Sequence, residues 1–577
     1  MKKIMIVLLA VLLAFGVVCA KDTGEKAYEV TEQSYPFYLG SVDSLWDGSF
    51  PLYFINGVND VPYISLESLS DFLVTTYHSN DDLNYELTLK VDGPDAVLVR
   101  ENGYYMAMDF DADTITFNDY NAFRLQSSKT TLIDLLSTEG VNEAGEAALF
   151  LRDQDASYSR YGDMYTIDLS SYGIDLVAQD GSYYIPLQTA SDILIAPAMK
   201  NPILFNGQAM FFANDSKIGD VKYGLTPLGE LYYSAGPVER SEALAEFGYK
   251  ELCLALDNIY GLKEVHDIKS FDQVFHQIAY DQLLKGQDPE YADKALNSFI
   301  GYFLDDGHSQ FHGYSWQVGE KEFSLAKGPG KQKYYDAWDY YSDARTAVYG
   351  QGFLPYEEVG NTAYITFDMF SRYLGDEDYY AYNEGEELPP DTIALIIEAH
   401  KQITRENSPI ENVVIDLSNN GGGAVDSAIF VLSWMLGEAP ITVKDQNTGA
   451  MSTAIYRADV NLDGQFDEKD TITDRKLYCL ISPISFSCGN LVPAALKASD
   501  KVTLLGRTSG GGSCVVQHLS TAWGTMFDIS GSYRMSFLKN GSFYDIDQGV
   551  APDYTISTPA KFYDREALTD FINNKVF

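Results

Sequence analysis

Two apolar runs in the second half of the chain each lead through a short turn into a helix, and this repeated pattern limits the fold most. The runs open the segments Val413–Gly423 and Leu480–Asn490. Continuous apolar runs of this length are typical of strands that are buried on both faces, as in parallel sheets. Strand and helix patterns alternate from Ala363 to about Ile556. They predict a parallel α/β domain.

Length and charge set the wider limits. At 577 residues, with 46% hydrophobic and 21% charged residues, the chain exceeds one domain and is able to bury a large core. Its formal net charge is −43. A surface this acidic repels nucleic acid and anionic lipid, so neither is expected as a partner.

Residues 1–20 predict an export signal. Basic residues at the start precede an apolar run from Ile4 to about Val18, and a small-residue cleavage site ends at Ala20. This run is short for a membrane span, and no later segment has about 18 uninterrupted apolar residues, so no transmembrane segment is expected. The mature protein is expected to be secreted or displayed at the cell surface. Cys19 leaves a lipid-anchored form as the alternative.

Residues 21–237 predict a β-rich α+β region that contains a duplication. Val61–Leu73 and Tyr183–Leu194 each show a turn, a short strand and an amphipathic helix. Two copies indicate a duplicated module and no solenoid, which needs more repeats. The expected role of this region is binding or spacing, and the binding role includes association with the cell wall.

Residues 238–318 predict a helical unit, because Ser241–Tyr260, Phe271–Leu284 and Tyr291–Phe303 carry apolar residues at helical spacing. Residues 319–360 are expected to form a loop-rich linker. The α/β core is expected to span residues 361–560, with a loop insertion at about 445–475, and residues 561–577 to form a C-terminal helix.

Ser487 is the candidate nucleophile, because it stands at a turn from a strand into a helix. A hydroxyl at such a turn is exposed, and the amides that follow it at the helix N-terminus favour negative charge. We therefore expect Cys488 N–H, with the N–H of either Gly421 or Gly422, to form an oxyanion hole. A serine before a helix is more often an N-cap, and Ser485 is a competing nucleophile.

Five segments in this order resemble the tail-specific, or C-terminal processing, serine peptidase family over residues 240–560. They are residues 304–309, 413–423, 480–490, 505–511 and 549–553. The resemblance implies a crotonase-like (ClpP/crotonase) α/β core with a helical cap and endopeptidase activity.

The chain departs from the commonest pattern of that family, which has a lysine about 25 residues after the nucleophile. Gly510–Ser513 stand there instead, and the usual inserted peptide-binding module is missing. Both departures resemble the tricorn-core-like branch, in which histidine is the base. His308 fits that base, although His312 lies nearby, and Asp545 or Asp547 would orient it. No cofactor is implied for the chemistry.

A separate acidic loop predicts a calcium site, and the expected role of the ion is structural. Oxygen ligands recur at loop positions 1, 3, 5, 9 and 12, with glycine at position 6 and a backbone carbonyl at position 7. Asp at position 12 replaces the usual Glu, as in dockerin-type loops. The expected ligands are Asp459, Asn461, Asp463, Gln465, Asp467 and Asp470.

Together these features predict a secreted serine endopeptidase that acts on proteins or peptides through an acyl-enzyme. The alternative is a catalytically inactive relative that binds peptides or the cell wall. Labelling by a serine-directed fluorophosphonate would separate the two.

Overall fold

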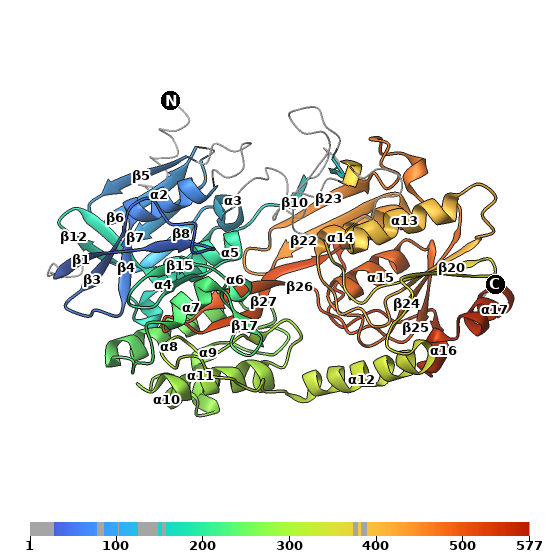
Figure 1. Ribbon diagram of the computed structural model, residues 1–577. Coiled ribbons are helices and arrows are strands. Elements are labelled where there is room, and N and C mark those ends of the chain that lie inside the picture. Colours follow the sequence, from blue (N-terminus) through green and yellow to red (C-terminus); the bar gives the residue numbers. More distant parts are fainter. Residues whose placement is uncertain are drawn as a thin grey trace.

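The computed structural model describes residues 28–77, 86–101, 103–124, 148–152, 157–372, 379–381 and 389–575. The predicted export signal and Cys19 lie outside the described residues. Figure 1 shows the N-terminal half, in blue and green, beside an α/β half in orange and red. Strand β27 (Met526–Ser536) reaches from the second half into the first, and helix α12 (Pro329–Tyr349) runs along the lower side.

A six-stranded sheet forms the centre of the second half. Its strand order is β19-β20-β21-β24-β25-β30, in which β19 is antiparallel to β20 and all other neighbours are parallel. Because β21 and β24 are aligned with Asp416 opposite Leu480, the turns after both strands leave the same edge. The strands are β19 (Tyr356–Val359), β20 (Thr362–Thr366), β21 (Asn412–Asp416), β24 (Lys476–Ile481), β25 (Val502–Gly506) and β30 (Tyr554–Thr555).

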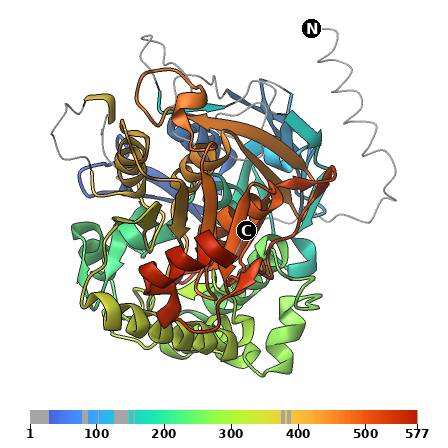
Figure 2. The same ribbon diagram turned by 90° about the vertical axis from the view of Figure 1, so that its right-hand side faces the viewer.

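Helices cover both faces of this sheet. Val413 and Ile415 point into the core shared with α14, whereas Val414 points into the core beneath α12, as the alternation of a strand requires. Figure 2 shows the C-terminal helices in red in front of α12. The first face carries α13 (Thr392–Thr404), α14 (Val425–Leu436) and α15 (Cys488–Ala498), and the second carries α12, α16 (Ala560–Tyr563) and α17 (Arg565–Lys575).

The stretch 319–360 contains a long helix, contrary to the expected loop-rich linker. Helix α12 has 21 residues, and Tyr341 is its buried anchor, with its ring 5.2 Å from that of Phe562. Its other positions are mostly polar or tyrosine, so the apolar stripe that marks a helix in sequence is narrow. Packing of Tyr341 against α16, which lies near the C-terminal end of the chain, therefore stabilises a helix whose own apolar stripe is narrow.

The helical unit before α12 has more breaks than its sequence predicts. The second expected helix is interrupted at Ala279, whose φ of 59° lies outside the helical region. The third continues from α11 into a π-helical segment that ends next to the His308 turn. The elements are α8 (Glu242–Ile259), α9 (Phe271–Gln277), α10 (Asp281–Leu284), α11 (Pro289–Ser298) and η3 (Phe299–Leu304).

The duplicated segments of the N-terminal half form one sheet. Strands β4 (Pro62–Ser65) and β13 (Ser182–Pro186) are antiparallel neighbours, with Ile64 opposite Ile185, and each leads into a helix. The two copies therefore share one core. This sheet has the order β1-β3-β4-β13-β12, formed by β1 (Val30–Tyr35), β3 (Phe50–Ile55), β4, β13 and β12 (Val177–Gln179).

Other N-terminal elements extend this core. A second five-stranded sheet contains β11 (Tyr165–Asp168), β8 (Thr114–Phe117), β7 (Tyr105–Asp109), β6 (Asp95–Arg100) and β5 (Leu87–Asp92). A three-stranded sheet contains β14 (Ile203–Phe205), β15 (Met210–Phe212) and β2 (Phe37–Leu39). The helices here are α2 (Leu66–Tyr77), α3 (Tyr120–Arg124), α4 (Leu187–Ala190), η2 (Ser191–Ile195), α5 (Ala196–Met199), α6 (Asp215–Ile218) and α7 (Pro227–Tyr233).

A seven-stranded sheet joins the two halves. It includes β9 and β10 from the N-terminal half, both paired with β23, while β18, just after His308, pairs with β27. The expected domain boundaries therefore do not separate the packing units. The strands are β9 (Phe150–Arg152), β10 (Ser157–Arg160), β18 (Gln310–Phe311), β22 (Ala439–Asp445), β23 (Met451–Ala458), β26 (Cys514–Ser520) and β27.

None of the helices in the described part of the chain combines the length and apolar character needed to span a lipid bilayer.

Candidate active site

Ser487 occupies a sharp turn between β24 and α15. Its backbone has φ 56° and ψ −122°, a combination rarely adopted by residues other than glycine, and its N–H donates to Gly511 O at 2.9 Å. Although Ser487 stands at the N-cap position of α15, its side chain makes no capping hydrogen bond. The hydroxyl group is therefore not used to hold the helix.

Ser485, the competing nucleophile, is bound inside the same turn. Its side chain is fully buried, its hydroxyl donates to Leu417 O at 2.7 Å, and it accepts the N–H of Ser482 at 3.0 Å. The bond to Leu417 joins the turns that follow β21 and β24, and the bond from Ser482 closes the turn after β24. The geometry gives Ser485 a structural role.

His308 is held by a turn that Asp306 organises. One carboxylate oxygen of Asp306 accepts the N–H groups of His308 and Ser309, both at 3.0 Å. The imidazole ring lies against Phe486, with 4.7 Å between ring centroids, and its Nε2 is buried without a hydrogen-bond partner among the described residues. Burial lowers the pKa of His308, and the charges of Asp306, Asp547 and Asp528 oppose that shift.

Ser487 and His308 line the same cavity, which has a volume of about 530 Å³. The turn residues Gly421, Gly423 and Gly510 complete its inner wall. No hydrogen bond joins Ser487 Oγ to His308 in this arrangement of the described residues. Catalytic hydrogen bonds are often long or poorly aligned without substrate, so the shared cavity is the relevant observation.

The Phe486 ring explains two glycines around this cavity. A Cβ atom on Gly307 would lie 2.3 Å from the Phe486 ring, and one on Gly512 would lie 2.6 Å from it and 3.2 Å from His308 Cε1. A side chain at either position would therefore displace the aromatic ring on which His308 rests.

The two candidate acids occupy different environments. Asp547 has little exposed side chain, accepts the N–H and hydroxyl of Ser513 at 3.1 Å, and acts electrostatically on His308. Asp545 is 56% exposed and pairs with Arg534 at 2.7 Å. Neither makes a hydrogen bond to His308 in the described structure. Asp547 is the better placed of the two to influence His308.

The predicted oxyanion donors are partly engaged elsewhere. Gly421 N–H donates to Asp368 O at 3.2 Å, and Gly422 N–H donates to Asn420 Oδ1 at 2.9 Å. By contrast, Cys488 N–H, in the first turn of α15, has no acceptor among the described residues. Gly422 still has to lack a side chain, because a Cβ there would lie 2.7 Å from the Cβ of Ser487.

His312 belongs to a different cluster. Its Nε2 lies 2.9 Å from Asp528, whose other oxygen is 2.7 Å from His518 Nδ1, and its Nδ1 lies 3.4 Å from Asp215. The ion pair with Asp528 raises the pKa of His312 against the effect of burial. His312 does not line the cavity that contains Ser487.

The predicted calcium loop is closed by its own hydrogen bonds. Asp459 accepts the N–H groups of Asp463 and Gly464, and Asp470 accepts those of Val460, Asn461 and Asp467. Lys469 Nζ lies 3.6 Å from Asp463 and 3.8 Å from Asp467. No group of three or more His, Cys, Asp or Glu side chains among the described residues is arranged to hold a metal. The calcium site stays a prediction.

Several residues of the cavity escaped the sequence analysis, among them Lys331, Tyr334 and Phe486. Lys331 and Tyr334 lie on α12, in the stretch expected to be a linker. The carboxylate of Asp305 caps the start of α12 by accepting Gly330 N–H at 2.6 Å and Lys331 N–H at 2.8 Å. Because Asp305 is distant from α12 in the sequence, only the folded structure shows this contact.

Comparison with known sequences identifies one matching family. The sequence profile of peptidase family S41 matches residues 361–556. A curated protein from Chlamydia pneumoniae is 30% identical to this chain over 99 residues, which are 17% of this chain and 16% of that relative. The match thus spans about a sixth of that relative's length.

Several solved structures are similar at low identity. The photosystem II D1 C-terminal processing protease is 16% identical with a TM-score of 0.27, covering 37% of this chain and 47% of that one. A putative peptidase from Parabacteroides merdae is 15% identical with a TM-score of 0.40, covering 58% and 97%. The tricorn protease is 9% identical with a TM-score of 0.34, covering 96% and 74%.

Proposed function

With residues 361–556 identified as a peptidase family S41 domain, we propose that the chain is a serine endopeptidase with Ser487 as nucleophile and His308 as general base. One observation carries this proposal. The Ser487 hydroxyl, which makes no helix-capping hydrogen bond, and the His308 Nε2 atom, which has no hydrogen-bond partner among the described residues, belong to residues that line the same cavity. Both groups lack the internal bonds that a structural role would give them.

In the proposed reaction, His308 Nε2 accepts the proton of the Ser487 hydroxyl as Oγ attacks a peptide carbonyl carbon. Cys488 N–H donates to the resulting oxyanion at the N-terminus of α15. The imidazolium then protonates the departing amine, which leaves an ester on Ser487. Water attacks this ester with His308 again as base and restores the enzyme.

The proposal also includes the acidic residue that supports His308 and a second N–H donor to the oxyanion. Asp547 supports the imidazolium electrostatically, because it is the shielded candidate of the two. Gly423, which lines the cavity, is a better second donor than Gly421 or Gly422, whose amides are engaged. We also propose a crotonase-like core for residues 361–560 and export through residues 1–20.

The proposal is tested by fluorophosphonate labelling and by cleavage of a peptide library. Wild type should label and cleave, and Ser487→Ala should lose labelling and at least about 10⁴-fold of the rate. Ser485→Ala is the matched control, since it removes a buried structural hydroxyl from the same turn and should still label. A folded wild type that neither labels nor cleaves would establish the inactive peptide- or wall-binding relative instead.

A further inference from the structure

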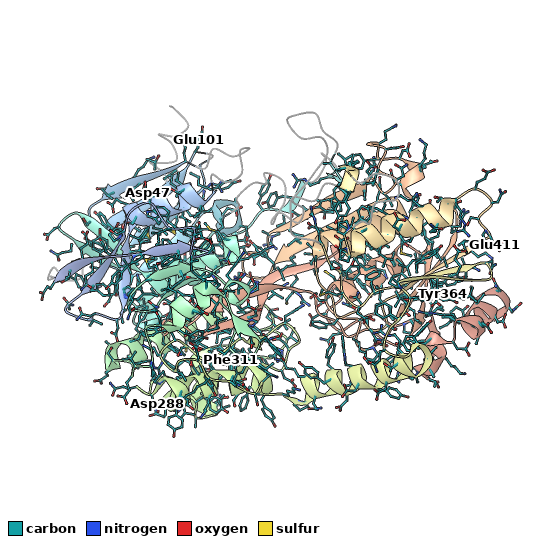
Figure 3. The ribbon with its side chains drawn as sticks, viewed as in Figure 1. Asp47, Glu101, Asp288, Phe311, Tyr364 and Glu411 are labelled. Atoms are coloured by element: carbon teal, nitrogen blue, oxygen red, sulfur yellow. The ribbon has the colours of Figure 1, made fainter. Side chains whose placement is uncertain are left out.

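One part of the wall of the cavity beside Ser487 is formed by apolar and aromatic side chains. Phe311, labelled in Figure 3, belongs to this wall. Such walls exclude water and strengthen any electrostatic contact made within them. The lining side chains of this kind are Phe311, Leu325, Tyr334, Tyr335, Phe486 and Val516.

Two lysines on this wall have no carboxylate partner. Lys331, in the first turn of α12, is partly buried and its Nζ donates to Ser309 O. Lys327 lies at the exposed rim, with its Nζ 4.0 Å from the centroid of the Tyr335 ring. No carboxylate oxygen of the described residues lies within 4.0 Å of either ammonium group. Burial lowers the pKa of Lys331, and the charges of Asp306 and Asp305, which lie beyond ion-pair distance, oppose that shift.

This lack of partners is unexpected in so acidic a chain, which has 83 acidic and 40 basic side chains. Exposed Lys294 and Lys321 both pair with Glu290, at 2.8 Å and 2.5 Å. The carboxylate of Asp305, which lines the same cavity, is occupied by the backbone amides of Gly330 and Lys331. The two cavity lysines are thus left available to a ligand.

We propose that Lys331, with Lys327 at the rim, binds a carboxylate of the peptide substrate beside the bond that Ser487 attacks. This inference rests on the proposed peptidase function and adds its substrate class. An ammonium group has three donors, and Lys331 uses one on Ser309 O, so two remain for a carboxylate. The carboxylate belongs to an Asp or Glu side chain or to a free C-terminus.

The predicted preference for peptides with a carboxylate is opposite to the effect of the protein's overall charge. A net charge of −43 repels acidic peptides at a distance, so overall charge alone would favour neutral or basic substrates. Selectivity for a carboxylate would therefore have to arise from local contacts in the cavity. This difference of sign makes the measurement decisive.

The test measures binding to full-length Ser487→Ala by fluorescence anisotropy. One arm uses end-blocked peptides in which each position in turn carries Glu or Gln. The other arm uses neutral peptides with a free or an amidated C-terminus. We expect at least one arm to show binding about tenfold tighter for the carboxylate, which corresponds to about 1.4 kcal/mol.

Variants of Lys331 in the same background locate the effect. Lys331→Gln keeps a donor for Ser309 O but loses the charge, and it should reduce the preference to less than about twofold. Lys331→Arg should retain the preference, and thermal unfolding should show that both variants are folded. Lys333→Gln, exposed on the same helix and outside the cavity lining, is the control that should change nothing.

Equal affinities in both arms, no binding of any peptide, or a preference that survives Lys331→Gln would overturn the inference. The peptidase proposal is tested independently, by fluorophosphonate labelling of the wild type. A wild type that selects carboxylate peptides but is never labelled would refute catalysis and leave this binding site supported.

Discussion

At the scale of single residues, the candidate site depends on places where a side chain is missing. Gly422 leaves room for the Cβ of Ser487, and Gly307 and Gly512 leave room for the ring of Phe486, which supports His308. These three glycines come from separate turns. Their common effect is to let Ser487 and His308 line one cavity.

We predict that Gly512→Ala lowers kcat/KM by about 10²-fold, because its Cβ would collide with Phe486 and shift His308. Gly541→Ala is the matched control. Both glycines have positive φ, 85° and 77°, so both variants should lose about 1 kcal/mol of stability, but no atom lies within 4 Å of a Cβ at Gly541. Peptide cleavage and thermal unfolding of both variants check this; equal activity losses would contradict it.

A second prediction concerns the pH profile. His308 must be neutral to act as base, and burial lowers its pKa, so kcat/KM should fall with acidity only below about pH 6.5. Asp547→Asn removes a charge that raises this pKa and should move the acid limb to lower pH while reducing kcat. Asp545→Asn should leave the limb in place. The reverse pattern would make Asp545 the acid.

At the scale of secondary-structure elements, the loop between β23 and β24 carries the predicted calcium site. The loop Asp459–Asp470 has glycine at the position that needs positive φ, since Gly464 has φ 76°. If it binds calcium as the sequence predicts, calcium should raise the melting temperature. At 100 times the dissociation constant the gain is about 2.7 kcal/mol.

Asp463→Ala should abolish this calcium-dependent shift, since Asp463 is the predicted ligand at loop position 5. Asp474→Ala, an exposed acid just outside the loop that pairs with adjacent Arg475, should preserve it. Differential scanning fluorimetry with calcium and with chelator measures both. A wild type whose melting temperature is unchanged up to about 10 mM calcium would refute the calcium site.

Helix α8 carries a buried carboxyl group that makes stability depend on pH. Burial raises the pKa of Glu251 to about 8, although Thr189 donates to its Oε2 at 2.6 Å. The folded state therefore holds a proton that the unfolded chain releases near pH 4.5. The stabilisation is fully present below pH 4.5 and is lost as the pH rises through about 8.

Glu251→Gln should weaken this dependence, because the amide keeps the shape without titrating; buried Asp192, whose pKa is also raised by burial, remains in the variant. We expect the free energy of unfolding of wild type to fall between pH 6 and 8 by up to about 1.4 kcal/mol per pH unit relative to the variant. Glu246→Gln, exposed on the same helix, should follow wild type. Urea unfolding at several pH values decides this, and parallel curves for Glu251→Gln and wild type would contradict it.

At the scale of the whole molecule, the two halves exchange segments. Strands β9 and β10, from the N-terminal half, pair with β23, and Phe150 packs edge-on against Phe430 of α14 at 5.7 Å. In return, Trp523 and Phe527 join the core of the helical unit around α8. Each half therefore completes the core of the other.

We predict that residues 238–577 do not fold stably when expressed alone, although they contain every residue that matches the peptidase family S41 profile. Without β9 and β10 the edge of β23 is exposed, and such edges promote aggregation. Coexpression with residues 28–237 should restore a soluble complex that copurifies and, if the proposed function holds, labels at Ser487. A monodisperse 238–577 fragment with the melting temperature of the full chain would contradict this.

The sequence alone identified the elements with strong local signals. Val413–Gly423 and Leu480–Asn490 were each predicted as a strand and a turn that lead into a helix, and the structure places the two strands side by side in a parallel sheet. Runs of apolar residues and turn glycines carry this information locally. The resemblance to the tail-specific peptidases rested on the same segments, and the S41 match agrees with it.

Tertiary structure decided what depends on distant partners. Helix α12 has a narrow apolar stripe and becomes helical against α16, and only then does Lys331 reach the cavity of Ser487. The engaged amides of Gly421 and Gly422 and the different environments of Asp545 and Asp547 also follow from contacts across the chain. Local sequence patterns record the propensity of a segment, whereas burial and charge pairing depend on residues far away in the chain.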